Sequence, residues 1–196
     1  GNGTAGRTVA HSLGVVPEMI ITKNRTTTGT HFAVYNKGLN GGVTPENYYL
    51  LLNNTQQNYA DPDIWNDTPP SSTAFTVGAN EKVNTSNANF IAYLFASLAG
   101  ISKVGSFTHV YHTDTNVDCG FSNGARFILI KRTDAAGDWR VYDTTRGIIA
   151  GADPELKLNS TAAEYTGGDY IDPYSQGFTV VGANYNSGTY IFYAIA

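Results

Sequence analysis

The sequence repeats itself, and this internal repeat limits the possible folds more than any other feature. Residues 50–55 and 156–161 both read Leu-x-Leu-Asn-x-Thr, and residues 70–77 and 173–180 both read Pro-x-Ser-x-small-Phe-Thr-Val. Three apolar segments match as well: 19–23 with 127–131, 32–35 with 139–142, and 90–96 with 190–196. Because the five matches occur in one order, we interpret the chain as two copies of one unit, residues 1–98 and 99–196.

The spacing between matched residues falls from 108 for Lys23 and Lys131 to 100 for Tyr93 and Tyr193. Such a slow decrease is typical of loops that shortened after a duplication. The second copy opens on the strand-like segment 103–108, whose counterpart in the first copy would precede Gly1. We therefore expect the first copy to lack one strand, which lies upstream in a longer chain or comes from another segment or subunit. The start at Gly1, without Met or a signal-peptide pattern, also suggests an excised or processed piece.

The matched segments predict an all-β fold. They are short, mostly five to seven residues long, rich in Ile, Val, Phe, Tyr and Thr, and separated by clusters of Gly, Asn, Asp and Pro. We expect two tandem antiparallel β-sandwiches of the jelly-roll or lectin-like kind. Segment 126–131 and the apolar segments 90–96 and 190–196 predict central strands. A capping-box pattern at 161–164, with 54–57 at the matching place, predicts a helix of one or two turns in each copy.

Composition excludes several classes of function. The net charge is −4 and no basic run occurs, which argues against a nucleic-acid partner. The single cysteine, Cys119, excludes an internal disulfide and a cysteine-based zinc site. No apolar run reaches the roughly 18–20 residues of a membrane helix. No Gly-x-Ser-x-Gly elbow is present, and His109 and His112 are three residues apart, so on a strand they point to opposite faces. No catalytic residue is therefore expected.

Two groups of acidic residues are candidates for chemistry. Asp61 and Asp63 flank Pro62, and Asp169 and Asp172 precede Pro173. Loop carboxylates are ligands that calcium prefers, and a glycosidase would also use two carboxylates. Aspartate is equally a common turn former, and no EF-hand loop pattern accompanies these residues. We retain Asp61, Asp63, Asp169 and Asp172 as candidate metal ligands, with calcium as the only candidate cofactor.

Aromatic residues next to Asn, Asp or Gly are the candidates for a binding surface. Exposed rings beside amides and carboxylates suit sugar stacking or a protein interface. The alternative is that the loops fold back and the rings cover the ends of the sandwiches. The candidate residues are Trp65, Tyr59, Tyr111, Tyr165, Tyr170 and Tyr174.

Two stretches carry a resemblance to a known family. Residues 3–14, followed by 17–23, resemble a repeat in virion proteins of tailed phages, especially marine ones. Segments 124–139 and 168–173 look like its second copy. The resemblance implies a tail fibre, appendage or capsid-surface protein, located on the virion, and it carries no catalytic residues. The expectation is a non-enzymatic structural protein that assembles as a homo-oligomer with other virion subunits and contributes to adhesion to host-surface glycans. The alternatives are a lectin-like carbohydrate-binding module, assisted by calcium, and a glycan-cleaving depolymerase.

Overall fold

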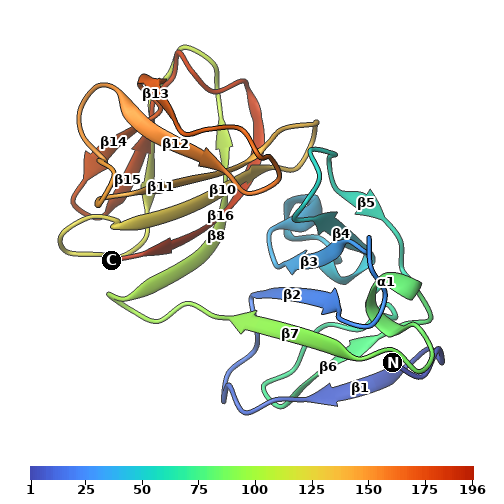
Figure 1. Cartoon of the computed structure of the whole chain (residues 1–196). Helices are drawn as coiled ribbons and strands as arrows, with labels where there is room; N and C mark the ends of the chain where they lie inside the picture. Colours follow the sequence, from blue (N-terminus) through green and yellow to red (C-terminus); the bar gives the residue numbers. More distant parts are fainter. The chain divides into compact units, whose positions relative to one another are not determined.

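Short β-strands make up nearly all the regular structure, so the all-β prediction is confirmed. The computed structural model describes residues 1–196 and divides them into two units, Gly1–Ala96 and Ser97–Ala196 (Figure 1). All strand pairings are antiparallel, and each sheet lies within one unit. For strands that are neighbours in sequence, antiparallel pairing follows from the short connections, because parallel neighbours need long crossovers.

The first unit holds a five-stranded sheet in the order β5-β4-β3-β2-β7 and a separate pair of β1 with β6. Its strands are β1 (Arg7–Ala10), β2 (Met19–Asn24), β3 (Phe32–Asn36), β4 (Tyr48–Leu51), β5 (Tyr59–Ala60), β6 (Ala74–Val77) and β7 (Phe90–Phe95). One helical turn, α1 (Glu81–Asn84), and two 3-10 turns, η1 (Leu39–Gly42) and η2 (Pro45–Asn47), complete it. These helical turns are three or four residues long, so none of them could span a lipid bilayer.

The second unit holds a six-stranded sheet, β13-β12-β11-β10-β16-β8, and a three-stranded sheet, β14-β15-β9. Its strands are β8 (Ser102–His109), β9 (Thr115–Asp118), β10 (Phe127–Arg132), β11 (Trp139–Asp143), β12 (Asp153–Lys157), β13 (Tyr165–Gly168), β14 (Ile171–Tyr174), β15 (Gly177–Val180) and β16 (Gly188–Ile195). The predicted central position of segment 126–131 is confirmed, because β10 lies between β11 and β16.

The strand ladders of the two units correspond in order and in register. Met19 of β2 lies opposite Phe95 of β7, and Phe127 of β10 lies opposite Ile195 of β16. Met19 and Phe127 are 108 residues apart, and Phe95 and Ile195 are 100 residues apart. These are the spacings at which the sequence segments match. The ladders β2–β3, β3–β4 and β1–β6 correspond in the same way to β10–β11, β11–β12 and β9–β15.

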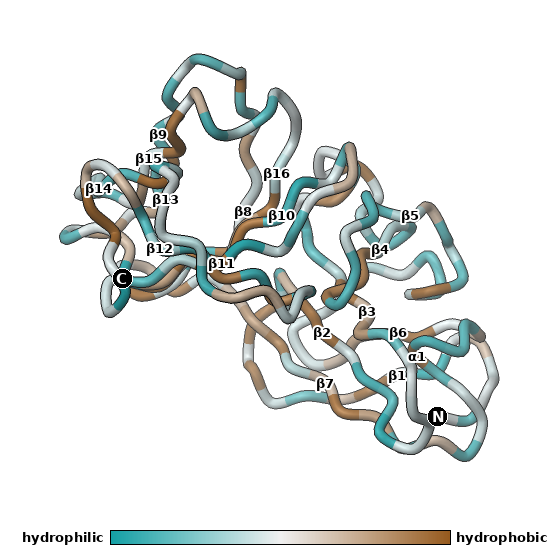
Figure 2. The backbone as a smooth tube through the Cα atoms, turned by 45° about the horizontal axis from the view of Figure 1, so that its top comes forward, coloured by the Kyte–Doolittle hydropathy of each residue, from teal (hydrophilic) through white to brown (hydrophobic).

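Each unit has its own hydrophobic core, and in Figure 2 the hydrophobic stretches lie mainly along the strands. The first core is built around Ile20, Tyr35, Ile64, Trp65 and Phe75. The second core is larger and rich in aromatic rings; it includes Val117, Phe121, Ile128, Tyr142, Phe178, Tyr185, Tyr190 and Phe192. Burial of these side chains is the main favourable contribution to folding of each unit.

The apolar segment 90–96 forms an edge strand, so its predicted central position is wrong. β7 pairs only with β2, whereas its counterpart β16 is covered by β10 on one side and β8 on the other. Tyr93 of β7 is 49% exposed, and the other β7 side chains are partly exposed. An apolar sequence indicates that a strand packs against a core, but it does not indicate whether another strand pairs with it on each side.

The helices predicted at 54–57 and 161–164 are also absent, and both segments lie outside regular structure. Asn54 instead accepts a hydrogen bond from the Gln56 N–H at 2.8 Å, and Ser160 accepts one from the Ala162 N–H at 3.0 Å. These side chains compete with helix formation by holding the backbone in a local turn.

Candidate functional site

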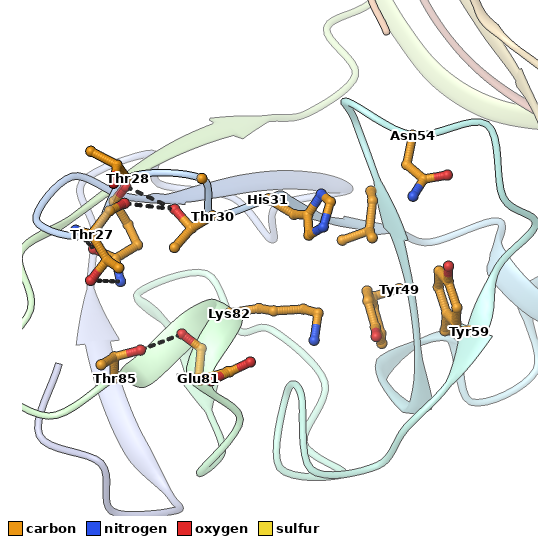
Figure 3. Close-up of a pocket in the computed structure, with 13 residues that line it drawn as sticks. Thr27, Thr28, Thr30, His31, Tyr49, Asn54, Tyr59, Glu81, Lys82 and Thr85 are labelled. Atoms are coloured by element: carbon orange, nitrogen blue, oxygen red, sulfur yellow. Dashed lines mark hydrogen bonds between the residues drawn. The ribbon is translucent and has the colours of Figure 1, made fainter.

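The main candidate site is a half-open cleft of about 580 Å³ in the first unit (Figure 3). It lies between the β4–β5 pair, the turn that joins β2 to β3, and helix α1. Side chains from all three segments face it: Thr27, Thr28, Thr30, His31, Tyr49, Asn54, Tyr59, Glu81, Lys82 and Thr85. The cleft therefore combines residues from four separate stretches of sequence.

Two stacked tyrosines form the aromatic wall of the cleft. Tyr49 of β4 lies opposite Tyr59 of β5, and their ring centroids are 5.1 Å apart with an interplanar angle of 18°. The ammonium of Lys82 lies 5.9 Å from the centroid of the Tyr49 ring. Burial, together with Asp61 and Tyr59, raises the pKa of Tyr49, so its hydroxyl stays protonated at neutral pH. Tyr49 is 6% exposed and Tyr59 is half-buried, so the ring surface that the pair leaves open belongs mainly to Tyr59.

The opposite wall is polar and is fixed by the β2–β3 turn. Asn24 accepts hydrogen bonds from the N–H groups of Thr26 at 2.9 Å and Thr27 at 3.1 Å. The Lys23 ammonium donates to the Thr30 hydroxyl at 2.9 Å. Such side-chain bonds to a turn hold its backbone in one conformation. The row of threonines therefore has a fixed position along the rim.

The remaining polar groups of the cleft come from His31, Asn54 and Glu81. A ring nitrogen of His31 lies 3.3 Å from the Asn53 amide oxygen, which orients the imidazole. Glu81 is the only carboxylate among the lining residues. A glycoside hydrolase would need a second carboxylate on the other side of the bond it cleaves. Ring faces with scattered donors and acceptors instead suit the binding of a polyhydroxylated ligand.

The second unit has a smaller hollow, of about 320 Å³, beside β12 and β13. Glu155 and Tyr165 face each other there in the register that Tyr49 and Tyr59 occupy in the first unit. The Arg140 guanidinium carbon lies 4.8 Å from the ring centroid of Tyr170, and an Arg140 nitrogen lies 2.9 Å from a Glu155 oxygen. This hollow is lined by a paired, largely buried charge cluster rather than by a stacked aromatic wall.

Buried tyrosines complete that charge cluster. The Tyr142 hydroxyl donates to Glu155 at 2.9 Å and lies 3.1 Å from the Tyr185 hydroxyl. Burial alone would lower the pKa of Arg140, but the nearby Tyr185, Tyr142 and Glu155 outweigh it and raise that pKa. Arg140 therefore stays charged. Because each charge has a partner, the cluster fits a structural role in the core of the unit.

The structure separates the predicted aromatic residues into three groups. Tyr59 lines the large cleft, and Tyr165 and Tyr170 line the small one. Tyr111 is 47% exposed on a loop, and Tyr174 is half-buried in β14. The prediction of Trp65 as an exposed ring is wrong: it is 2% exposed, and its indole N–H donates to the Tyr48 carbonyl at 3.1 Å. Trp65 belongs to the first core, where its ring packs against Tyr35.

The candidate metal ligands do not assemble into a metal site. Asp61 accepts hydrogen bonds from the Asp63 N–H and the Asn80 amide, at 2.9 and 2.7 Å. Asp169 and Asp172 each have one solvent-shielded oxygen with no hydrogen-bond partner, and burial, with Asp172 and Asp114, raises the pKa of Asp169. No group of three or more His, Cys, Asp or Glu side chains is placed to hold a metal ion.

Tyr59 is the only residue of the large cleft that sequence reasoning named as a candidate; among those that it missed are His31, Tyr49, Glu81 and Lys82. Tyr49 lies within an apolar strand, and Glu81 and Lys82 lie on the short helix that the sequence pattern did not predict. Only the pairing of Tyr49 with Tyr59 could have been anticipated, from a hairpin between the two segments.

Comparison with known proteins places the chain in a family. A family described as "Domain of unknown function (DUF7483)" matches residues 1–196, the whole chain. The chain belongs to this family. No curated protein and no solved structure matches it. For this DUF7483 chain, arguments about function therefore rest on the cleft and on the residues that line it.

Proposed function

We propose that the two units are copies of one β-sandwich fold and that the first unit binds a carbohydrate, without cleaving it, in its aromatic cleft. The stacked Tyr49–Tyr59 wall carries this proposal, because sugar rings bind through their apolar faces to flat aromatic surfaces. The threonine rim, Asn54, His31 and Lys82 supply donors and acceptors for hydroxyl groups. The matching registers of the strand ladders support the duplication.

The resemblance of residues 3–23 to phage virion repeats extends the proposal to a biological setting. In it the chain is a structural subunit of a tail fibre, appendage or capsid surface, assembles with other copies, and helps the particle adhere to host-surface glycans. The low charged fraction, 14%, supports assembly, because uncharged polar surfaces are cheaper to desolvate than charged ones. Detection of this chain by mass spectrometry of purified particles would test the setting.

A glycan array tests the binding role. The intact chain, applied to bacterial surface polysaccharides and oligosaccharides, should bind a subset of them, and Tyr59→Ala should weaken that binding by about tenfold or more, the loss expected for one stacked ring. Tyr165→Ala, at the same register in the second unit, is the matched control and should bind normally. Adding a chelator should leave glycan binding unchanged, because the cleft binds through ring faces and polar side chains.

Three results would contradict the proposal. They are failure to bind any glycan, binding that Tyr59→Ala leaves unchanged, and release of cleaved product from a bound polysaccharide. Loss of binding with chelator would instead favour the calcium-assisted lectin.

A further inference from the structure

The outer edge of β7 has the pattern of a strand whose neighbour is missing. The Arg25 N–H donates to the Asn89 carbonyl, so in the antiparallel ladder with β2 the peptide groups of Phe90, Ala92 and Leu94 point to the open side. The corresponding residues of β16 point toward β8. An apolar strand with a row of unpaired peptide groups is an unusual free edge, because such edges pair readily with other chains.

A comparison of side-chain burial in β16 and β7 shows which residues a strand next to β7 would cover. Tyr190 and Phe192 of β16 are each 4% exposed, and Ala194 is fully buried. Their counterparts Phe90, Ala92 and Leu94 are only partly buried. In the second unit Phe107 of β8 supplies this cover: its ring stacks on Tyr190, with centroids 5.3 Å apart, and also contacts Phe192.

The amino-terminal segment is fixed at one end of this open edge. The Gly1 nitrogen donates to the carbonyl of Ala88, just before β7. Asn84, which is fully buried, donates to the Thr4 carbonyl at 2.8 Å and accepts from the Asn2 N–H at 2.9 Å. In Figure 1 the amino terminus lies beside α1 and the start of β7.

The registers give the position of Gly1 relative to a missing strand. At the spacing of 108 that relates β1 to β9, Gly1 corresponds to His109, the last residue of β8. At the spacing of 100 that relates β7 to β16, Ala88 corresponds to Gly188, the residue opposite His109. The Gly1–Ala88 hydrogen bond therefore corresponds in position to the His109–Gly188 pair, the last pair of the β8–β16 ladder.

We propose that β7 is completed by an antiparallel strand of about seven residues that is joined directly to the nitrogen of Gly1. This inference rests on the proposed duplication, since β8 is its template. The strand would place inward-facing side chains over Phe90, Ala92 and Leu94. Gly105 of β8 has no room for a side chain, because an added Cβ would lie 2.7 Å from the Phe192 ring. Ala92 stands at the Phe192 position, so the residue opposite Ala92 has space to be larger than glycine.

A second copy of this chain is the alternative occupant, through pairing of β7 with β7 across a two-fold axis. Gly1 argues against it, because the residue already occupies the acceptor at the start of the edge, and the Asn84 side chain fixes the segment that follows through its bonds to Asn2 and Thr4. A strand that continues from Gly1 meets no such obstacle, since its ladder extends a bond that is already formed.

The test is to join the seven residues of Ser102–Thr108 to Gly1 of the full chain and measure amide hydrogen exchange in β7. Exchange at Phe90, Ala92 and Leu94 should slow by about tenfold or more relative to the chain without the extension, because opening would then require breaking the new ladder. A second extension with Gly105→Val in the added copy should protect at least as well. The matched control carries Phe107→Asp and Gly105→Pro in the added copy and should give no protection.

Equal exchange in the three extended chains and the unextended chain would overturn the proposal. Protection of β7 in the unextended chain that grows with protein concentration, with dimers in sedimentation, would assign the edge to a second copy and also overturn it. Glycan binding by the extended chain is read in parallel. Protection of β7 without glycan binding would count against the cleft, and glycan binding without protection of β7 would count against the strand.

Discussion

Tyr49 and Tyr59 face each other across the β4–β5 ladder with their rings stacked at 5.1 Å, and Glu155 and Tyr165 occupy the same register in the second unit. The same backbone position thus carries an aromatic pair in one unit and a charged residue beside a tyrosine in the other. In the proposed function, only the first hollow therefore offers a stacked aromatic pair to a sugar ring.

The stacked pair also makes a prediction for stability. Tyr59→Ala removes the ring from the face of Tyr49 and should lower the free energy of unfolding of the first unit by at least about 1 kcal/mol, the typical worth of an aromatic pair beyond the area that it buries. Tyr59→Phe keeps the stack and should be nearly neutral. Urea unfolding, followed by hydrogen exchange of first-unit peptides, measures both. A loss as large for Tyr59→Phe as for Tyr59→Ala would show that the hydroxyl, not the ring, stabilises the pair.

Trp65 should be among the most sensitive positions of the first unit. Its ring is 2% exposed, lies edge-on to Tyr35 at 6.0 Å and donates to the Tyr48 carbonyl. Trp65→Ala should cost about 3–5 kcal/mol because it leaves a large cavity and an unpaired carbonyl. Trp65→Phe should cost less. Chemical denaturation with exchange readout on β3 measures the loss, and a change below 1 kcal/mol for Trp65→Ala would place the ring outside the core.

Lys131 should make the second unit more stable as pH rises above 8. The side chain is fully buried, donates to the Gly137 carbonyl at 2.6 Å, and burial lowers its pKa to about 8. In the unfolded chain its pKa returns to about 10.5, so between these values the unfolded state binds more protons than the folded state. The free energy of unfolding should therefore rise with pH, by at most about 1.4 kcal/mol per unit.

The measurement uses Trp139, the buried tryptophan of the second unit, as a fluorescence reporter in a Trp65→Phe background. Urea midpoints between pH 7.5 and 9.5 avoid the range in which the buried tyrosines titrate. Lys131→Met should flatten the pH dependence. A stability that falls over this range in the parent chain, or a slope that Lys131→Met leaves intact, would rule out a depressed lysine pKa.

Sequence reasoning predicted the positions of strands better than the surroundings of side chains. The segments that match at spacings of 108 and 100 form strands with corresponding registers, because short apolar segments bounded by turn residues favour strands. The cleft was not predictable in this way. Lys82 and Tyr49 meet only through tertiary packing, and Trp65 looked exposed because polar neighbours surround it in sequence but not in space.

Cys119 provides the last prediction, a reporter of opening in the second unit. The thiol is 5% exposed in the core, and burial raises its pKa to about 12. The thiolate is the reactive form, so alkylation by iodoacetamide at pH 8 should be slow in the folded chain and fast in guanidinium. Because Cys119 is the only cysteine, mass spectrometry of the intact chain counts the modified fraction directly. Gly177→Ala, which would place a Cβ 2.1 Å from the Val117 carbonyl beside Cys119, should speed the reaction by loosening β9 from β15. Labelling of the native parent chain at the rate of a free thiol would contradict the buried position.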